Sequence, residues 1–88
     1  MNRNSDNKVG TAEALKRIGI SAERLRYWER AGVVSPEYVQ CGTRKFRRYS
    51  KEDLIRAALV KKLVDNDKYT LEGAKRRLEE EMLFLKGE

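Results

Sequence analysis

Three residues, Gly19-Ile20-Ser21, separate two stretches of helix-forming sequence and limit what this chain can fold into. We expect a first helix over residues 11–18, capped by Thr11, and the glycine of the junction can end it in a left-handed conformation. The serine of the junction caps a second helix over residues 22–31, which Gly32 ends. Two short helices this close in the chain pack at an angle, as in a helix-turn-helix.

After the second helix the pattern changes from helical to extended. Residues 33–39 and 45–49 are rich in β-branched and aromatic side chains, and Cys41-Gly42-Thr43 lies between them as a turn. Pro36 suits an edge strand, because proline cannot donate a hydrogen bond to a neighbouring strand. The pattern therefore predicts a two-stranded antiparallel wing.

Two further helices follow the wing. Ser50 and Asp53 form a near-capping box that opens a third helix. We expect that helix to turn one set of apolar residues inward: Leu54, Ile55, Ala58, Leu59, Leu63 and Val64. Thr70 caps a fourth helix that reaches about residue 85 and carries an apolar seam: Leu71, Ala74, Leu78, Met82 and Leu85. We expect residues 71–78 of that seam to pack on the third helix and residues 82–85, with Leu83 and Phe84, to be open to self-association.

These elements predict one small, mostly α-helical domain, a winged helix-turn-helix of four helices with a two-stranded β wing. We expect the domain to span residues 10–85, after a disordered tail over residues 1–9. The chain has 88 residues, 20 Lys and Arg against 14 Asp and Glu, and a formal charge of +6. This excess of positive charge favours an anionic partner, and nucleic acid before a membrane.

The second helix carries the first candidate binding surface. On a helical wheel Ala22, Leu25 and Trp28 share the inward side, and the opposite side carries polar and aromatic residues. Arginine pairs bidentately with guanine and glutamate accepts from the cytosine amino group, so this side can read the major groove of DNA. The alternative is a charged face that is only solvated. The candidate contacts here are Ser21, Glu23, Arg24 on the flank, Arg26, Tyr27 and Arg30.

The second strand of the wing carries the other candidate surface. Residues 44–48 hold four cations, and strand alternation places Tyr49 on the same face as two of them. Such a cluster of like charges is relieved by the phosphate backbone, so we expect the wing, residues 43–49, to lie on the backbone or in the minor groove. The alternative is that lysine and arginine only protect an edge strand from aggregation. The candidate contacts are Arg44, Lys45, Arg47, Arg48 and Tyr49.

The sequence argues against several other classes of protein. It has one cysteine, Cys41, and no histidine, which leaves no intrachain disulfide, no usual zinc site and no histidine-based catalysis. It also lacks a glycine-rich phosphate loop and an apolar run long enough to span a bilayer. We therefore expect no enzyme activity, no catalytic or metal-binding residue, no cofactor, no small-molecule effector site and no membrane partner.

The order of these parts resembles the DNA-binding domain of the MerR family of bacterial transcription regulators. The resemblance covers most of residues 11–81 and depends on short motifs in the right order: Glu13, Gly19-Ile20-Ser21, Leu25-Arg26-Tyr27-Trp28-Glu29, Gly32-Val33-Val34 with Pro36, Phe46-Arg47-Arg48-Tyr49-Ser50, Glu52-Asp53-Leu54 and Tyr69-Thr70-Leu71-Glu72-Gly73-Ala74. It implies a dimer on a pseudo-palindromic promoter in the bacterial cytoplasm, associated with the nucleoid. By matched position, Arg26 and Tyr27 contact DNA from the second helix, Arg47 contacts it from the wing, and Arg24 tunes the sequence preference.

The chain departs from this family at several positions. Lys45 and Lys68 stand where the family has glycine, each directly before an aromatic residue. The long dimerisation helix and the effector-binding region of the family do not follow within these 88 residues. Two other functions therefore stay open: an excisionase-like or architectural DNA-binding protein, and a protein-interaction module that uses the leucine seam.

Overall fold

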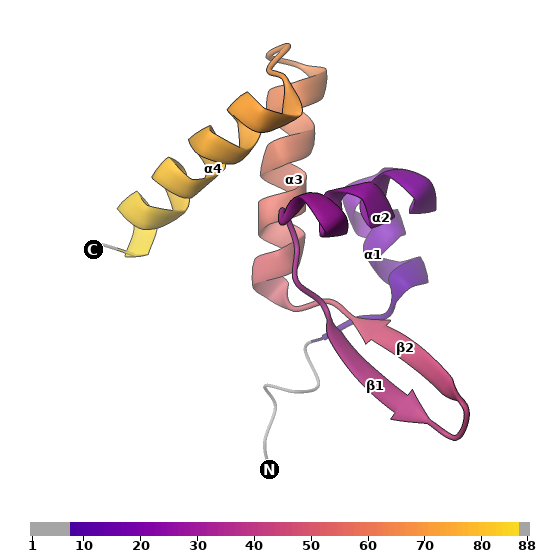
Figure 1. Cartoon of the computed structure of the whole chain (residues 1–88). Helices are drawn as coiled ribbons and strands as arrows, with labels where there is room; N and C mark the ends of the chain where they lie inside the picture. Colours follow the sequence, from indigo (N-terminus) through magenta and orange to yellow (C-terminus); the bar gives the residue numbers. More distant parts are fainter. Residues whose placement is uncertain (1–7, 87–88) are drawn as a thin grey trace.

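The computed structural model describes residues 8–86, with side chains through Phe84, and shows six elements (Figure 1). In chain order they are α1 (Thr11–Ile18), α2 (Ala22–Ala31), β1 (Glu37–Cys41), β2 (Arg44–Arg48), α3 (Lys51–Asp65) and α4 (Leu71–Lys86). The two strands form one antiparallel sheet, which projects from the helices as a hairpin. This confirms the predicted winged helix-turn-helix.

The helix-turn-helix has the predicted bounds, and its caps explain them. Gly19 ends α1 with φ of 84°, and Ser21 caps α2 by accepting from the backbone N–H of Arg24 at 3.1 Å. The prediction that Thr11 caps α1 is wrong, because Thr11 is already helical and Gly10 is the N-cap. The carbonyl of Gly10 accepts the first helical bond from Ala14 at 3.0 Å, so the helix begins without a side-chain cap.

The wing begins later in the chain than the sequence predicts. Val33 and Val34 are not in a strand; they are buried in the core, which accounts for their apolar character. The hairpin closes through a two-residue turn at Gly42 and Thr43, where Gly42 has φ of 66°. This turn sets a register in which Tyr38 lies opposite Arg47 and Val39 lies opposite Phe46.

Helix α3 has the predicted capping box but is rotated relative to the prediction. Its buried residues are Asp53, Ala57, Val60 and Leu63, whereas Ile55 is 46% exposed. Ala58, also expected inside, is exposed as well. The carboxylate of Asp53 accepts from the backbone N–H of Ser35 at 2.9 Å and of Ser50 at 3.0 Å. These two hydrogen bonds hold Asp53 on the inner side of α3. Ala57 and Val60, one and two helical turns further along, therefore face the core as well.

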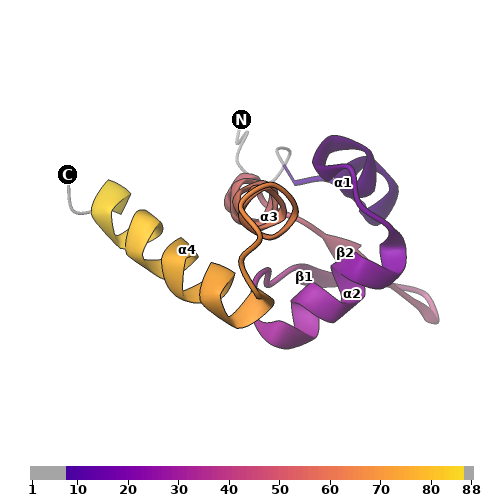
Figure 2. The same ribbon diagram turned by 90° about the horizontal axis from the view of Figure 1, so that it is seen from above.

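The core lies where α3 meets the other helices and the start of the wing. Viewed from above, α3 lies between α4 on one side and the α1–α2 pair on the other (Figure 2). The largest fully buried side chains come from α2, α3, α4 and the segments on either side of the wing: Leu25, Trp28, Val33, Tyr49, Val60 and Leu78. Ala74, Leu78 and Met82 of the predicted seam are buried, and the side chain of Leu85 lies outside the described part. Trp28 is one of these buried residues and thus belongs to the core, as its position on the helical wheel predicts.

Two residues before the predicted domain start contact the wing. Residues 1–7 of the predicted tail lie outside the described residues, but Val9 pairs with Tyr49 through two backbone hydrogen bonds of 2.9 and 2.7 Å. Lys8 forms an ion pair of 2.8 Å with Glu37 of β1. Lys8 and Val9 thus lie against the base of the wing. Among the described residues, no helix is long and apolar enough to cross a membrane.

Candidate nucleic-acid interface

The outer face of α2 is open to solvent along its whole length. Glu23, Arg26, Tyr27 and Arg30 are exposed, and Tyr27 has 51% of its surface accessible. The guanidinium of Arg30 lies 5.9 Å from the centre of the Tyr27 ring, so one cation and one aromatic ring share this face. The predicted outward residues of this helix are therefore brought together, with Leu25 and Trp28 buried behind them. Ala22, expected on the buried side, is exposed because it lies at the first position of the helix.

Arg24 lies on one flank of α2 and is engaged within the protein. Its guanidinium binds Asp65 of α3 through two hydrogen bonds of 2.6 and 3.2 Å and lies 4.9 Å from the centre of the Trp28 ring. The hydrogen bond from Arg24 lowers the pKa of Asp65. This bidentate pair fixes the start of α2 against the end of α3.

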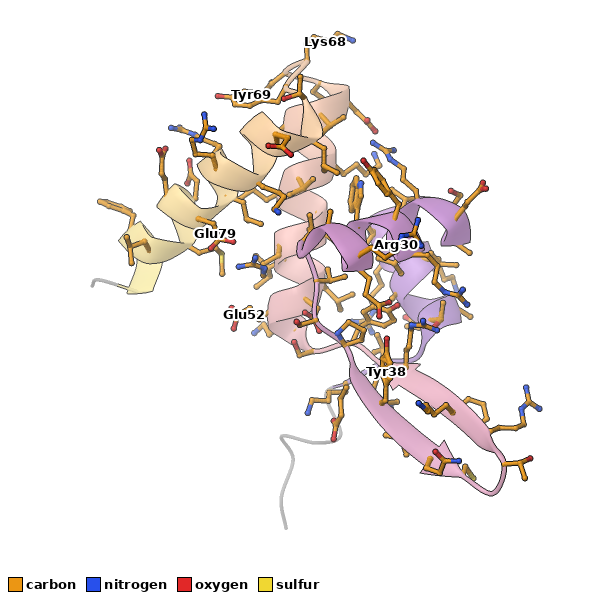
Figure 3. All side chains as sticks on the ribbon, viewed as in Figure 1. Arg30, Tyr38, Glu52, Lys68, Tyr69 and Glu79 are labelled. Atoms are coloured by element: carbon orange, nitrogen blue, oxygen red, sulfur yellow. The ribbon has the colours of Figure 1, made fainter. Side chains whose placement is uncertain are left out.

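Glu29 lies on the other flank of α2 and contacts the wing. Its Oε1 accepts from Arg47 Nε of β2 at 2.8 Å, and its Oε2 accepts from the hydroxyl of Tyr38 on β1. The hydrogen bond to Glu29 raises the pKa of Tyr38. Figure 3 shows Tyr38 pointing from β1 toward α2, on the same side of the molecule as Arg30. One carboxylate thus joins both wing strands to the helix.

The end of the wing presents its cations on aromatic rings. Arg44 lies 5.3 Å from the centre of the Phe46 ring, and Lys45 lies 5.6 Å from that of Tyr38. The register places these two pairs on opposite faces of the hairpin. Both cations are exposed, so the end of the wing is basic on each face.

The last two candidate residues of the wing point into the protein. Arg48 donates from Nη2 to the backbone carbonyl of Lys8 at 3.0 Å, and its Nε is buried. Tyr49 is 1% exposed, and burial raises the pKa of its hydroxyl. The prediction that Tyr49 contacts DNA is wrong, because its ring fills the core beneath the wing.

Sequence reasoning gives no role to Glu29 or Tyr38. A two-residue turn at Gly42-Thr43 places Tyr38 opposite Arg47, whereas the three-residue turn we expected would shift the register and place Tyr38 opposite Phe46. Glu29 follows Arg26 by three residues, so the two occupy neighbouring positions on the helix surface. The sequence feature that could have revealed the contact between Tyr38 and Arg47 was the length of the hairpin turn.

The other polar groups near this surface are engaged within the protein. A shallow hollow beside the end of α2 is lined by Val34, Ser50, Asp53 and Arg56, among others. Arg56 donates to the carbonyl of Val33 at 2.7 Å and to Glu79 at 2.8 Å, and both oxygens of Asp53 accept from backbone. Within residues 8–86, no three metal-ligating side chains gather at one place.

A helix-turn-helix with an exposed cationic second helix, joined to a basic two-stranded wing, defines the class of winged helix-turn-helix DNA-binding domains. The family comparison agrees and is more specific. Residues 11–81 match the family described as MerR HTH family regulatory protein, and the chain belongs to that family of DNA-binding transcription regulators. Comparison with curated proteins finds no significant match.

Proposed function

We propose that this protein binds double-stranded DNA at a specific sequence to regulate transcription. Helix α2, residues 22–31, enters the major groove, and the wing, residues 43–49, lies on the backbone or in the adjacent minor groove. The observation that carries this proposal is the shared carboxylate of Glu29, which ties the wing to one flank of α2. The exposed face of the helix and the basic hairpin consequently belong to one surface.

The residues of this surface divide into base-reading and backbone-binding groups. Arg26 is exposed without a carboxylate partner in the described part of the chain, and a bidentate pair with guanine is its natural contact. Glu23 can accept from a cytosine amino group. Ser21 at the start of α2, Tyr27, Arg30, Arg44 and Lys45 suit the sugar-phosphate backbone. Arg24 and Arg48 act mainly inside the protein, where their hydrogen bonds hold α2 and the wing in place.

The test begins with selection of a preferred site from random duplexes, followed by a salt titration of binding. Arg26→Ala is expected to weaken binding to that site by about 1–3 kcal/mol and to relax the preference at one base pair. Arg77→Ala on α4 is the matched control, because it removes the same charge away from α2 and should leave the preference unchanged. A salt slope near zero, or no site preferred by the wild type, would refute the proposal.

The apolar end of α4 supports a homodimer. Leu83 and Phe84 are 73% and 71% exposed at the end of a helix whose earlier seam is buried on α3. A second copy that covers these side chains would place two wings and two α2 helices on one pseudo-palindromic site. We propose that the protein acts in this form in the bacterial cytoplasm, at the nucleoid. Footprinting of one symmetric site supports a regulator, whereas a tandem array would support the excisionase-like alternative.

A further inference from the structure

Both strands of the wing donate to the same carboxylate on α2. Arg47 of β2 binds Glu29 Oε1 and Tyr38 of β1 binds Oε2. The ring of Tyr38 also lies 5.2 Å from the guanidinium of Arg47, so the three side chains form one cluster. Because Tyr38 and Arg47 are directly opposite in the register, this cluster holds the hairpin across its width.

The burial of this cluster indicates that it fixes the orientation of the wing on α2 more than it stabilises the fold. The side chains of Glu29 and Arg47 are 17% and 28% exposed, so both charges are largely removed from water. Desolvation of a buried ion pair offsets much of its attraction, and such pairs are best attested where they fix one arrangement of elements. A two-stranded hairpin has little stability of its own and needs such a contact to hold a single orientation.

We propose that Glu29 is a positioning residue that sets the angle between the wing and α2, and that it thereby determines how well the protein distinguishes its site from other DNA. This inference rests on the proposed function. Glu29 engages Arg47 through Nε, and a guanidinium has further N–H groups that can donate to a phosphate. The carboxylate of Glu29 also offsets the positive charge of Arg47 beyond contact distance. A phosphate is therefore attracted to Arg47 mainly where it contacts the guanidinium directly.

Two consequences follow when the carboxylate is neutralised in Glu29→Gln. The wing loses its fixed orientation, so ordering it on the correct site costs entropy that the wild type does not have to supply. The basic surface also gains one positive charge, which strengthens binding to any duplex. Affinity for the selected site is expected to fall about 5-fold and affinity for mixed-sequence DNA to rise about 2-fold, so that their ratio falls about 10-fold.

The orientation of the wing can be measured without DNA. Cys41 is the single cysteine of the chain and is exposed at the end of β1, so a nitroxide label there reports on the amides of α2 by paramagnetic relaxation. We expect Glu29→Gln to weaken and spread the relaxation pattern over α2, and Tyr38→Phe, which keeps the ring and loses the donor, to do so in part. Glu13→Gln is the matched control, because it removes the same charge from an ion pair within α1.

The two measurements together decide the proposal. An unchanged relaxation pattern in Glu29→Gln overturns it, whatever the DNA affinities are. A changed pattern with an unchanged ratio of the two affinities overturns the role in specificity, although the wild type still prefers its site. Partial recovery of both readouts in Glu29→Asp supports it, because that variant restores the charge on a shorter side chain. If the wild type prefers no site, the proposed function fails, and the same result overturns the specificity role of Glu29.

Discussion

Lys68 gives the most direct test of how backbone conformation limits the stability of this domain. It lies in the turn between α3 and α4 with φ of 64°, the one non-glycine residue with positive φ among those described (Figure 3). The left-handed conformation costs an L-residue about 1–2 kcal/mol, and glycine loses about 0.5–1 kcal/mol more than other residues in backbone entropy on folding. Lys68→Gly is therefore expected to stabilise the domain by about 0.5–1 kcal/mol, which raises Tm by roughly 3–6 °C.

The control for this prediction is Lys68→Ala, which removes the same side chain and keeps the strained backbone. Both variants lose the long hydrogen bond of 3.4 Å from Lys68 Nζ to the carbonyl of Asp65, so they differ mainly in backbone freedom. Thermal and urea unfolding followed by circular dichroism measure both. The reasoning is refuted if Lys68→Gly is no more stable than Lys68→Ala. Gly19→Ala tests the reverse, since Gly19 has φ of 84° and its substitution should destabilise the domain.

Three further predictions concern the core, an ion pair and the end of α4. In the described part of the structure the buried hydroxyl of Tyr49 has no partner within hydrogen-bond geometry, although Thr11 lies near it. Tyr49→Phe should consequently unfold at the same temperature as the wild type or higher and leave DNA affinity unchanged. Asp65 has a folded-state pKa below its ordinary value of 3.8, so its ionised form stabilises the fold at higher pH and this contribution disappears as pH falls through the folded pKa. The difference in Tm between the wild type and Asp65→Asn should thus be largest near neutral pH and shrink below pH 3.8. Sedimentation of the double variant Leu83→Asp/Phe84→Asp should show a monomer where the wild type sediments as a dimer, and equal sedimentation of the two proteins would contradict the α4 interface.

The features that the sequence predicts well are those set by neighbouring residues. Ser21 and Ser50 cap their helices because an N-cap bond reaches only three residues along the chain. The burial of Trp28 follows from its spacing to Leu25. In contrast, Arg24 is engaged by Asp65, 41 residues away, and no local pattern indicates that partner. A helical wheel places Arg24 on the flank of α2 in either case, so it cannot distinguish a contact with DNA from a contact with α3.

The errors in the wing have a different physical origin. Strand alternation places Tyr49 on the same face as Arg47, and that face turns toward α2 and the core at the base of the wing. A period-two pattern groups side chains by face, but it does not show which face the helices cover. In α3, likewise, helical spacing leaves the rotation open until the buried carboxylate of Asp53 fixes it.

The number of phosphates that the surface can neutralise depends on how many of its cations are already paired within the protein. Arg24 and Arg47 pair with carboxylates and Arg48 with a backbone carbonyl, whereas in the described part of the chain Arg26, Arg30, Arg44 and Lys45 have no such partner. With about 0.9 counterions released per phosphate, four cations give a log–log salt slope of about −4 for one chain and about −7 for two. The formal charge of +6 is not a measure of the number of phosphate contacts, because it also includes the charged residues on α3 and α4. The slope therefore reports whether one or two chains occupy the site, independently of any measurement of the free protein.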